Sequence, residues 1–445
     1  DNKFEIIKRA IKQYPPAIRI LELLYQQISE HPKEPSLTKF ELGKELGFTG
    51  EDGFTTYSQG IFIQALNLAI NKKEKNKIRT NWEGSSDKYA RMICGWLKHD
   101  KIKWVEVIRK NITVQIGTEN FSEKLTSYKI PQEGIKAFRD SRPRSSHPGI
   151  EKNVSFEMLA TKGSDKEYLR LRRANIILCL RDRKSIQQIQ RYLTNNNLQN
   201  IPEETIIDDI NNFSRIGLYI SNTKTGYKII DTIKLLKIPS NLTQTNISPS
   251  DLTIRKQNLS QNIHNLDHSF FDLLDLSIAG QKSSMQFEIR IVELLNLIIT
   301  AKHLSGGNRP EIIGYQPGTN PVDCMIMDSK SYAKGFKIPA NERDKMIRYI
   351  NEYNNKNEKL NQNKWWEKFQ NPGYPTNEIK FSFVSSTFIS RFENQLTYIK
   401  NSTGAHGCAI SIEILIKKVN SVLNNADKYG TDEFFRDIGC DALVT

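Results

Sequence analysis

The sequence is poor in cysteine and contains no long hydrophobic run. Its 5 cysteines are widely spaced and form no Cys-x-x-Cys pair; they are Cys94, Cys179, Cys324, Cys408 and Cys440. Such a set indicates neither a disulfide framework nor a zinc site, and it is typical of a reducing compartment. No apolar stretch reaches the ~20 residues that a membrane helix needs, and no secretory signal pattern is visible. We therefore expect a cytoplasmic protein without a membrane partner.

The motifs of several common enzyme classes are absent too. The 7 histidines are scattered and form no His-x-Glu or His-Glu-x-x-His pattern. The sequence has no P-loop, no Gly-x-Gly-x-x-Gly and no recognisable Ser-His-Asp arrangement. Nucleotide-driven and acyl-transfer chemistry are therefore unsupported.

Positive charge is what the sequence has in excess. The 445 residues include 64 Lys and Arg against 50 Asp and Glu, a net charge of +14. A basic surface attracts polyanions because binding releases their counterions, so nucleic acid is the favoured partner. A merely lysine-rich protein is the alternative, and charge alone does not decide between the two. The length predicts about two to four domains.

The first half of the chain repeats one plan of helices followed by a hairpin. In residues 1–144 the helices precede two short strand-like pieces, which we predict to turn at Lys110–Asn111. In residues 145–238 three helices precede a hairpin that turns at Lys224–Gly226. This order predicts two winged-helix subdomains in a multidomain α+β region, and two unrelated helical bundles are the alternative.

The second half has a different pattern. Residues 239–250 are polar and without periodicity, which indicates a linker. Residues 251–445 then alternate helices with strands, the pattern of an α/β domain. Within this domain the apolar periodicity predicts one helix over residues 283–304.

Charged side chains follow a predicted buried strand of the α/β domain. The run Val322–Met327 is β-branched and Met-rich, and it is followed by Asp328, Ser329 and Lys330. Side chains alternate along a strand, so Asp328 and Lys330 share one face. With Glu311 upstream, they form a set that binds Mg²⁺ through hard oxygens and activates water. The alternative is a solvated ion pair, since similar triplets occur elsewhere in the sequence.

A basic stretch in the first region predicts contacts with nucleic acid. Residues 72–110 contain 12 Lys or Arg and 5 Asp or Glu, and most of these cations suit phosphate. At the start of a predicted helix, Glu83 can accept a hydrogen bond from cytosine and Lys88 can donate to guanine. The alternative is that both are ordinary charges at a helix start.

Many segments resemble the FokI group of type IIS restriction endonucleases, in the same order along nearly the whole chain. The segments include QYPPAIRILELL, LTKFELGKELGFTGEDGFT, NWEGSSDKYARMICGW, EMLATKGSDKEYLRLRRA, KHLSGGNRPE, MDSKSYAKGF and DKMIRY. The resemblance implies a bacterial protein with a winged-helix recognition region, a linker and a nuclease domain of the PD-(D/E)xK fold. Double-stranded DNA is the implied partner and Mg²⁺ the implied cofactor. An earlier recognition subdomain of the family is expected to be missing from this chain.

The resemblance also assigns roles to particular residues. It implies Glu311, Asp328 and Lys330 as the catalytic set, with Glu311 and Asp328 as metal ligands. Glu311 stands where the family pattern has Asp, so the carboxylate is kept on an arm that is one methylene longer.

Further residues are implied for DNA recognition and for dimerisation. Thr80, Glu83 and Lys88 match base-contacting positions, although Thr80 stands where the family has Asn. Asp344 and Arg348 match the pair through which the nuclease domains form a transient homodimer. We therefore expect an Mg²⁺-dependent endonuclease that cuts both strands at a fixed offset from an asymmetric site. The alternative is a winged-helix regulator whose nuclease domain is inactive.

Overall fold

The computed structural model of the chain contains two compact units that each combine distant parts of the sequence. The described residues are 2–117, 119–145, 147–163, 165–234, 236–243, 248–304, 307–316, 322–356, 358–359, 361–369, 376–424 and 427–445. Unit 1 comprises Asp1–Thr56, Glu83–Asn111 and Lys124–Asn262. Unit 2 comprises Tyr57–Trp82, Ile112–Glu123 and Ile263–Thr445.

The domain boundaries expected at 144, 238 and 250 stay predictions. The two compact units do not follow the order of the chain, so they do not mark these boundaries. Residues 244–247 of the predicted linker lie outside the described residues.

Five helices form the first part of unit 1 around one apolar core. Helix α2 begins with Pro15 and Pro16, whose fixed φ suits a helix start, and it buries Ile18, Leu21 and Leu24. These side chains recur every three or four residues, which places them on one face of the helix. The helices are α1 (Asn2–Gln13), α2 (Pro15–Glu30), α3 (Lys39–Lys44), α6 (Ser85–Leu97) and α7 (Gln132–Ser141).

The hairpin of the first region differs from the prediction. Strand β2 (Glu106–Ile116) runs without a break through Lys110–Asn111, so the turn predicted there is wrong. Exposed and half-buried side chains alternate from Ile108 to Ile116, which keeps both polar residues within the pleat. The strand is followed by Gly117 at φ +60, a conformation that glycine adopts without strain.

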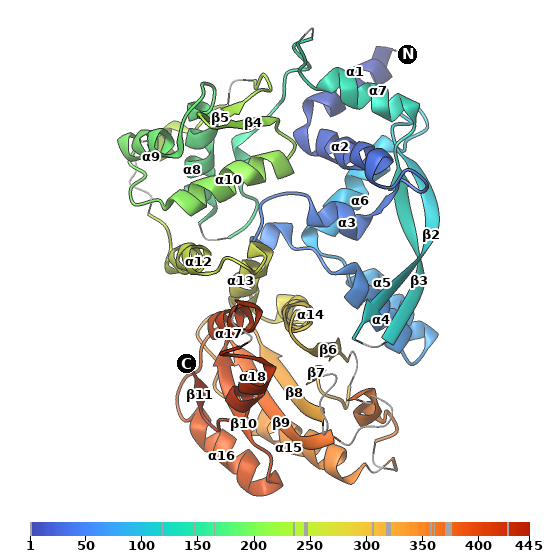
Figure 1. Cartoon of the computed structure of the whole chain (residues 1–445), viewed down its shortest axis with the longest axis vertical. Coiled ribbons are helices and arrows are strands. Elements are labelled where there is room, and N and C mark those ends of the chain that lie inside the picture. Colours follow the sequence, from blue (N-terminus) through green and yellow to red (C-terminus); the bar gives the residue numbers. More distant parts are fainter. Residues whose placement is uncertain are drawn as a thin grey trace. The chain divides into compact units, whose positions relative to one another are not determined.

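The partner of this strand was not predicted. Strand β3 (Glu119–Lys129) lies between β2 and the short strand β1 (Leu37–Thr38) in a three-stranded sheet. Figure 1 shows β2 and β3 side by side. The polar residues of β3 show no strand pattern in the sequence, because this strand forms through pairing with its neighbours rather than through an intrinsic preference for β-structure.

The second part of unit 1 follows the predicted order of three helices and a hairpin. Its elements are α8 (Lys166–Cys179), α9 (Ile186–Asn195), α10 (Glu203–Arg215), β4 (Ile220–Thr223) and β5 (Gly226–Ile229). Thr223 pairs with Gly226 across the antiparallel ladder, which confirms the predicted turn at Lys224–Gly226. A capping box between Ser185 and Gln188 begins α9.

A buried charge cluster joins two of these helices. Asp209 on α10 accepts hydrogen bonds from Arg172 at 2.7 and 3.0 Å and from Arg173 at 2.9 Å. All three side chains are buried. Burial alone would raise the pKa of Asp209, but the two guanidinium groups hold it below its ordinary value. The carboxylate is therefore ionised and fixes α8 against α10.

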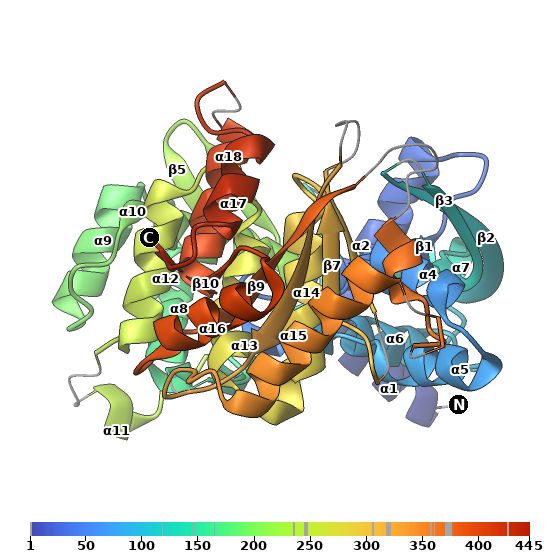
Figure 2. The ribbon, with the colours of Figure 1, turned by 90° about the horizontal axis from the view of Figure 1, so that it is seen from below.

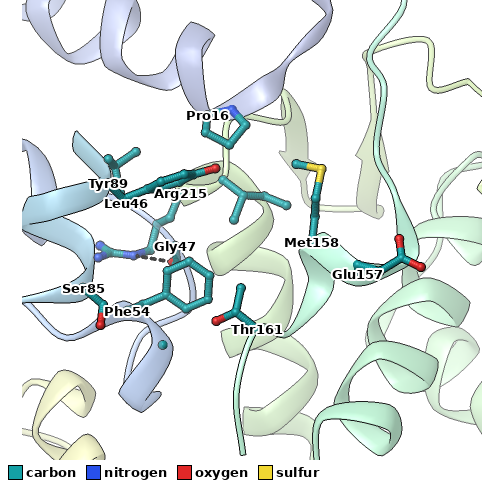
Figure 3. Close-up of a pocket in the computed structure, with 12 residues that line it drawn as sticks. Pro16, Leu46, Gly47, Phe54, Ser85, Tyr89, Glu157, Met158, Thr161 and Arg215 are labelled. Carbon is teal, nitrogen blue, oxygen red and sulfur yellow. Dashed lines mark hydrogen bonds between the residues drawn. The ribbon is translucent and has the colours of Figure 1, made fainter. Parts of the chain in front are cut away.

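An apolar cavity of about 350 Å³ lies inside unit 1 (Figure 3). Its walls include Pro16, Leu46, Phe54, Tyr89, Met158 and Ile216. At its edge the Nε of Arg215 donates to the carbonyl oxygen of Gly47 at 3.2 Å. None of the predicted site residues lines this cavity, so it is separate from the predicted chemistry.

A mixed six-stranded sheet forms the centre of unit 2. The strand order is β11-β10-β9-β8-β7-β6, with antiparallel pairs from β6 to β8 and parallel pairs from β8 to β11. The strands are β6 (Thr300–His303), β7 (Ile312–Tyr315), β8 (Val322–Lys330), β9 (Thr376–Ser385), β10 (Gly407–Ser411) and β11 (Leu443–Val444). The predicted α/β architecture is thus confirmed.

Helices surround this sheet. Helices α15 and α16 lie side by side (Figure 2), and their apolar side chains share a core with Ile326, Phe383 and Ala409 of the sheet. The alternation of side chains along β8 directs Cys324 and Ile326 toward this core. The α-helices within residues 263–445 are α13 (Asp272–Ile278), α14 (Ser284–Leu295), α15 (Ala340–Asn355), α16 (Phe392–Thr403), α17 (Ile412–Asn424) and α18 (Thr431–Ile438).

The single helix predicted over residues 283–304 is wrong in its last third. Helix α14 ends at Leu295, and Thr300–His303 form β6 instead. The side chain of Asn296 explains the break, because it accepts from the Ala301 amide at 2.9 Å and donates to the Ala301 carbonyl at 3.0 Å. An asparagine that bonds to nearby backbone in this way favours a turn over a helix.

The helices were also compared with the dimensions of a membrane. Within the described ranges, no helix has both the length and the apolar character required to cross one.

We predict that Asp209→Ala lowers the free energy of unfolding by about 3–5 kcal/mol, because buried Arg172 loses its carboxylate partner and buried Arg173 keeps only Glu51. Urea unfolding followed by circular dichroism measures this change. The control is Glu204→Ala, which removes an exposed carboxylate from the first turn of the same helix and should cost under about 1 kcal/mol. Equal effects of the two substitutions would contradict the prediction.

Candidate active site

The end of strand β8 directs two charged side chains toward helix α15. Cys324 and Ile326 on this strand face the core shared with α15 and α16. Asp328 and Lys330 continue the same alternation, so they share that face, as predicted. Their charged groups are 2.9 Å apart, from Lys330 Nζ to Asp328 Oδ1.

Glu311 reaches the same place from the neighbouring strand. It directly precedes β7, whose first residue Ile312 pairs with Met327 of β8. Its Oε2 accepts from the Ser329 amide at 3.0 Å, and its Oε1 accepts from Lys330 Nζ at 3.0 Å. The structure therefore brings the three predicted catalytic residues into direct contact.

Burial and charge shift the pKa values of this cluster. Burial, followed by repulsion from Glu311, raises the pKa of Asp328 above its ordinary value, although Lys330 and Lys345 oppose the rise. Burial disfavours the charged form of Lys330, but attraction to Asp328 and Glu311 outweighs it and raises the pKa of this ammonium. Lys330 is therefore a fixed positive charge in this arrangement.

The oxygens of the cluster suit a hard divalent cation. Asp328 is only 4% exposed, and its Oδ2 is buried without a hydrogen-bond partner. A buried carboxylate oxygen without a partner is costly unless a cation or water meets it. The described part of the chain contains no group of three or more His, Cys, Asp or Glu placed to hold a metal. Two carboxylates nevertheless fit Mg²⁺, which keeps several waters and takes phosphate oxygens as further ligands.

Two residues of this cluster were missed from the sequence. Glu342 and Lys345 lie one turn apart on α15, and their charged atoms are 3.4 Å apart. Lys345 Nζ is 3.5 Å from Asp328 Oδ1 and 3.7 Å from Glu311 Oε1. The i, i+3 spacing was visible in the sequence, but it does not show that this face of the helix meets the end of β8.

The two residues predicted for dimerisation do not pair with each other. Asp344 contacts the neighbouring Arg343 at 2.7 Å, and Arg348 Nε lies 3.6 Å from Glu352. The side chains of Asp344 and Arg348 are 60% and 48% exposed. Both side chains thus lie at the surface of the helix.

The three residues predicted to contact bases belong to different compact units, Thr80 to unit 2 and both Glu83 and Lys88 to unit 1. Thr80 belongs to α5 (Lys72–Asn81), and it is exposed. Its hydroxyl donates to the Asn76 carbonyl at 2.9 Å, one turn earlier. Helix α5 forms because the Asn71 side chain caps its first turn. Lys88 is exposed in the first turn of α6.

Glu83 is held by two cations. Its Oε1 accepts from Lys39 Nζ at 2.7 Å, and its two oxygens accept from Arg91 at 2.8 and 3.0 Å. Burial would raise the pKa of this carboxyl, but the hydrogen bonds and charges of Arg91 and Lys39 lower it to about 2. Glu83 is therefore an ionised acceptor whose direction is fixed.

The comparisons with known proteins agree along most of the chain. Family models match residues 3–138 as FokI recognition domain subdomain 2, residues 159–225 as the FokI D3 domain and residues 249–445 as the FokI cleavage domain. The type II restriction enzyme FokI of Planomicrobium okeanokoites is 36% identical over 419 residues, which are 93% of this chain and 70% of that enzyme. The type II restriction enzyme StsI of Streptococcus sanguinis is 28% identical over 424 residues, or 92% and 67% of the two chains.

Two solved structures have the same fold. The structure of restriction endonuclease FokI superposes with a TM-score of 0.86 at 33% identity, over 99% of this chain and 75% of that one. The structure of FokI bound to DNA gives 0.87 at 33% identity, over 99% and 74%. The chain is thus an enzyme of the type II site-specific nuclease class, with recognition and cleavage domains. It belongs to the FokI family, which confirms the resemblance predicted from the sequence.

We predict that Glu83→Gln destabilises the protein at pH 7 by about 1–2 kcal/mol, less than the full pKa shift implies because Arg91 is half exposed. The folded pKa lies below the ordinary 4.5, so this stability is present above pH 4.5 and is lost as the pH falls toward 2. Urea unfolding of both proteins between pH 7 and pH 3 measures the difference.

The exposed Glu133 supplies the control for this titration. Glu133→Gln removes an exposed carboxylate, and it should change the free energy of unfolding at pH 7 by under about 0.5 kcal/mol. A Glu83→Gln difference that stays constant down to pH 3 would show that the two cations do not hold the carboxylate.

Proposed function

We propose that this chain hydrolyses DNA phosphodiester bonds with Mg²⁺, at a fixed offset from an asymmetric site. The observation that carries the proposal is the cluster of Glu311, Asp328 and Lys330, in which a buried Asp328 oxygen has no partner. Such a set at the end of a central strand is the arrangement expected of a PD-(D/E)xK nuclease. Membership of the FokI family supports the same chemistry.

The residues of the cluster have different proposed roles in the hydrolysis. Glu311 and Asp328 are the residues that would hold the metal. When bound, Mg²⁺ lowers the pKa of water and neutralises charge on the phosphate. Lys330 orients the attacking water and stabilises the anionic transition state as a fixed cation. Water then forms the new P–O bond as the bond to the 3′ oxygen breaks, which leaves 5′-phosphate and 3′-hydroxyl ends.

Recognition is proposed for the helix-and-hairpin region, as two winged-helix subdomains. The net basic stretch 72–110 supplies cations for phosphates, and Thr80, Glu83 and Lys88 are proposed to contact bases. Two facts support this: Thr80 and Lys88 are exposed, and a FokI structure has been solved bound to DNA. Double-stranded DNA is therefore the proposed partner.

Cleavage of both strands is proposed to require two copies of the chain. One set of Glu311, Asp328 and Lys330 acts on one strand at a time. Asp344 and Arg348 lie one turn apart on α15 with exposed side chains, so a two-fold contact can pair each with the other on a second copy. We therefore propose a transient homodimer through this helix.

Replacing Asp328 by Ala should reduce cleavage of a plasmid with Mg²⁺ by roughly a thousandfold or more, because the metal and its activated water are lost. DNA binding, measured by fluorescence anisotropy in Ca²⁺, should stay within about twofold, since the substitution removes no recognition residue. Cleavage by purified Asp328→Ala at the wild-type rate would refute the site assignment.

The same assay separates the alternative function. A winged-helix regulator with an inactive nuclease domain leaves the plasmid intact with Mg²⁺ as well as with EDTA, whereas the proposed enzyme cuts only with Mg²⁺. Sequencing the cut ends then tests the fixed offset, because a nuclease without a defined site produces ends at varying distances from any one motif.

Arg348→Ala should slow double-strand cleavage about tenfold at low protein concentration and leave nicked plasmid as the main product. The reason is that the variant weakens the two-fold ion pairs while keeping the catalytic set. The measurement is the dependence of rate on protein concentration, expected to be steeper than linear for the wild type. Lys337→Ala, an exposed charge outside α15, serves as the control. A linear dependence in the wild type would argue against dimerisation.

A further inference from the structure

Helix α15 contributes a second ammonium group to the cluster at the end of β8. Lys330 Nζ lies 3.0 Å from Glu311 Oε1 and 2.9 Å from Asp328 Oδ1. Lys345 Nζ lies 3.7 and 3.5 Å from the same two oxygens. The two lysines thus share one carboxylate pair, although they come from a strand and a helix.

Glu342 holds both ammonium groups in place. Its Oε2 lies 3.4 Å from Lys330 Nζ and 3.4 Å from Lys345 Nζ. The pair Glu342 and Lys345 adds one negative and one positive charge, so the net charge of the cluster is unchanged. What the pair adds is a second cation placed beside the carboxylates.

The contacts of Lys345 are not those of an ordinary surface ion pair. One of the oxygens that it approaches belongs to Asp328, which is only 4% exposed. Its ammonium also lies 6.0 Å from the ring centre of Tyr349, a buried residue one turn further along α15. The helix and this ring therefore direct the side chain inward.

The two lysines differ in how tightly they are held. Lys330 makes the shorter contacts and its side chain is 15% exposed, whereas the side chain of Lys345 makes longer contacts and is 29% exposed. A long flexible arm with longer contacts changes partner at lower cost than a buried one. Lys345 is therefore the group that can leave the carboxylates when another ligand approaches.

We propose that Lys345 is a further catalytic residue and that Glu342 is its positioning residue. While no cation occupies Glu311 and Asp328, Lys345 screens their repulsion and competes for their oxygens. In the complex with DNA it turns to a non-bridging oxygen of the phosphate that is cut, beside Lys330. This inference rests on the proposed nuclease site.

The test combines a metal titration without DNA and a cleavage assay for Lys345→Gln. Binding of Mn²⁺, counted by electron paramagnetic resonance, should become about fivefold tighter because a competing cation is gone. Single-turnover cleavage at saturating DNA and Mg²⁺ should nevertheless slow about thirtyfold, because a cation beside the transition state is lost. These opposite directions are not expected of a residue that only supports the fold.

Lys356→Gln is the matched control, because it removes an exposed lysine that follows the C-terminal end of the same helix. It should leave both measurements within twofold of the wild type. Lys345→Met tests the same loss of charge with an apolar arm that keeps packing on Tyr349, in case the Gln variant does not fold. Unchanged Mn²⁺ affinity or unchanged cleavage in a folded Lys345 variant overturns the proposal.

The outcome for Asp328→Ala separates this inference from the proposed function. If that variant keeps its Mn²⁺ binding and its cleavage, the nuclease site itself is misplaced. If Asp328→Ala loses both Mn²⁺ binding and cleavage while Lys345→Gln behaves as the wild type, the nuclease site is supported and the proposed role of Lys345 is refuted.

Discussion

The close approach of two carboxylates is the constraint on which the charged cluster at the end of β8 depends. Glu311 and Asp328 come from neighbouring strands, and repulsion between them contributes to the raised pKa of Asp328. Such a pair persists only where cations or hydrogen bonds compensate it. Lys330 and the Ser329 amide supply that compensation, and β8 fixes both of them relative to Asp328. The strand therefore places the charge and its compensation together.

A second buried cluster also compensates like charges with an opposite charge, but there the like charges are positive. In unit 1 Asp209 compensates two arginines that burial would otherwise destabilise, and Glu51 pairs with one of them, Arg173. Both carboxylate oxygens of Asp209 accept hydrogen bonds from these arginines, and the cluster holds α8 and α10 together. At Asp328 one oxygen lacks a partner. The Asp209 cluster therefore serves the fold alone, whereas the Asp328 cluster has an oxygen that can still bind a ligand.

The sequence predicted the features that depend on local pattern. The alternation along Val322–Lys330 was sufficient to place Asp328 and Lys330 on one face, and the turn near Gly226 was predicted correctly. Strands β3 and β6 were missed because their residues are polar or continue a helical pattern, and only their partners make them strands. Glu342 and Lys345 were missed for a related reason, since helix periodicity does not say which face meets the sheet. The roles assigned to all the predicted site residues stay predictions, namely those of Thr80, Glu83, Lys88, Glu311, Asp328, Lys330, Asp344 and Arg348.

If Glu83 contacts a base as proposed, its ion pairs have a consequence for selectivity between DNA sequences. Lys39 and Arg91 already fix the Glu83 carboxylate in the free protein. Contact with a base would therefore cost this side chain little further conformational entropy. The two cations also prevent the side chain from turning away when the base opposite offers no donor. Under this proposal a mismatched base faces a fixed negative charge, and wrong sites are rejected through rigidity as much as through attraction to the right one.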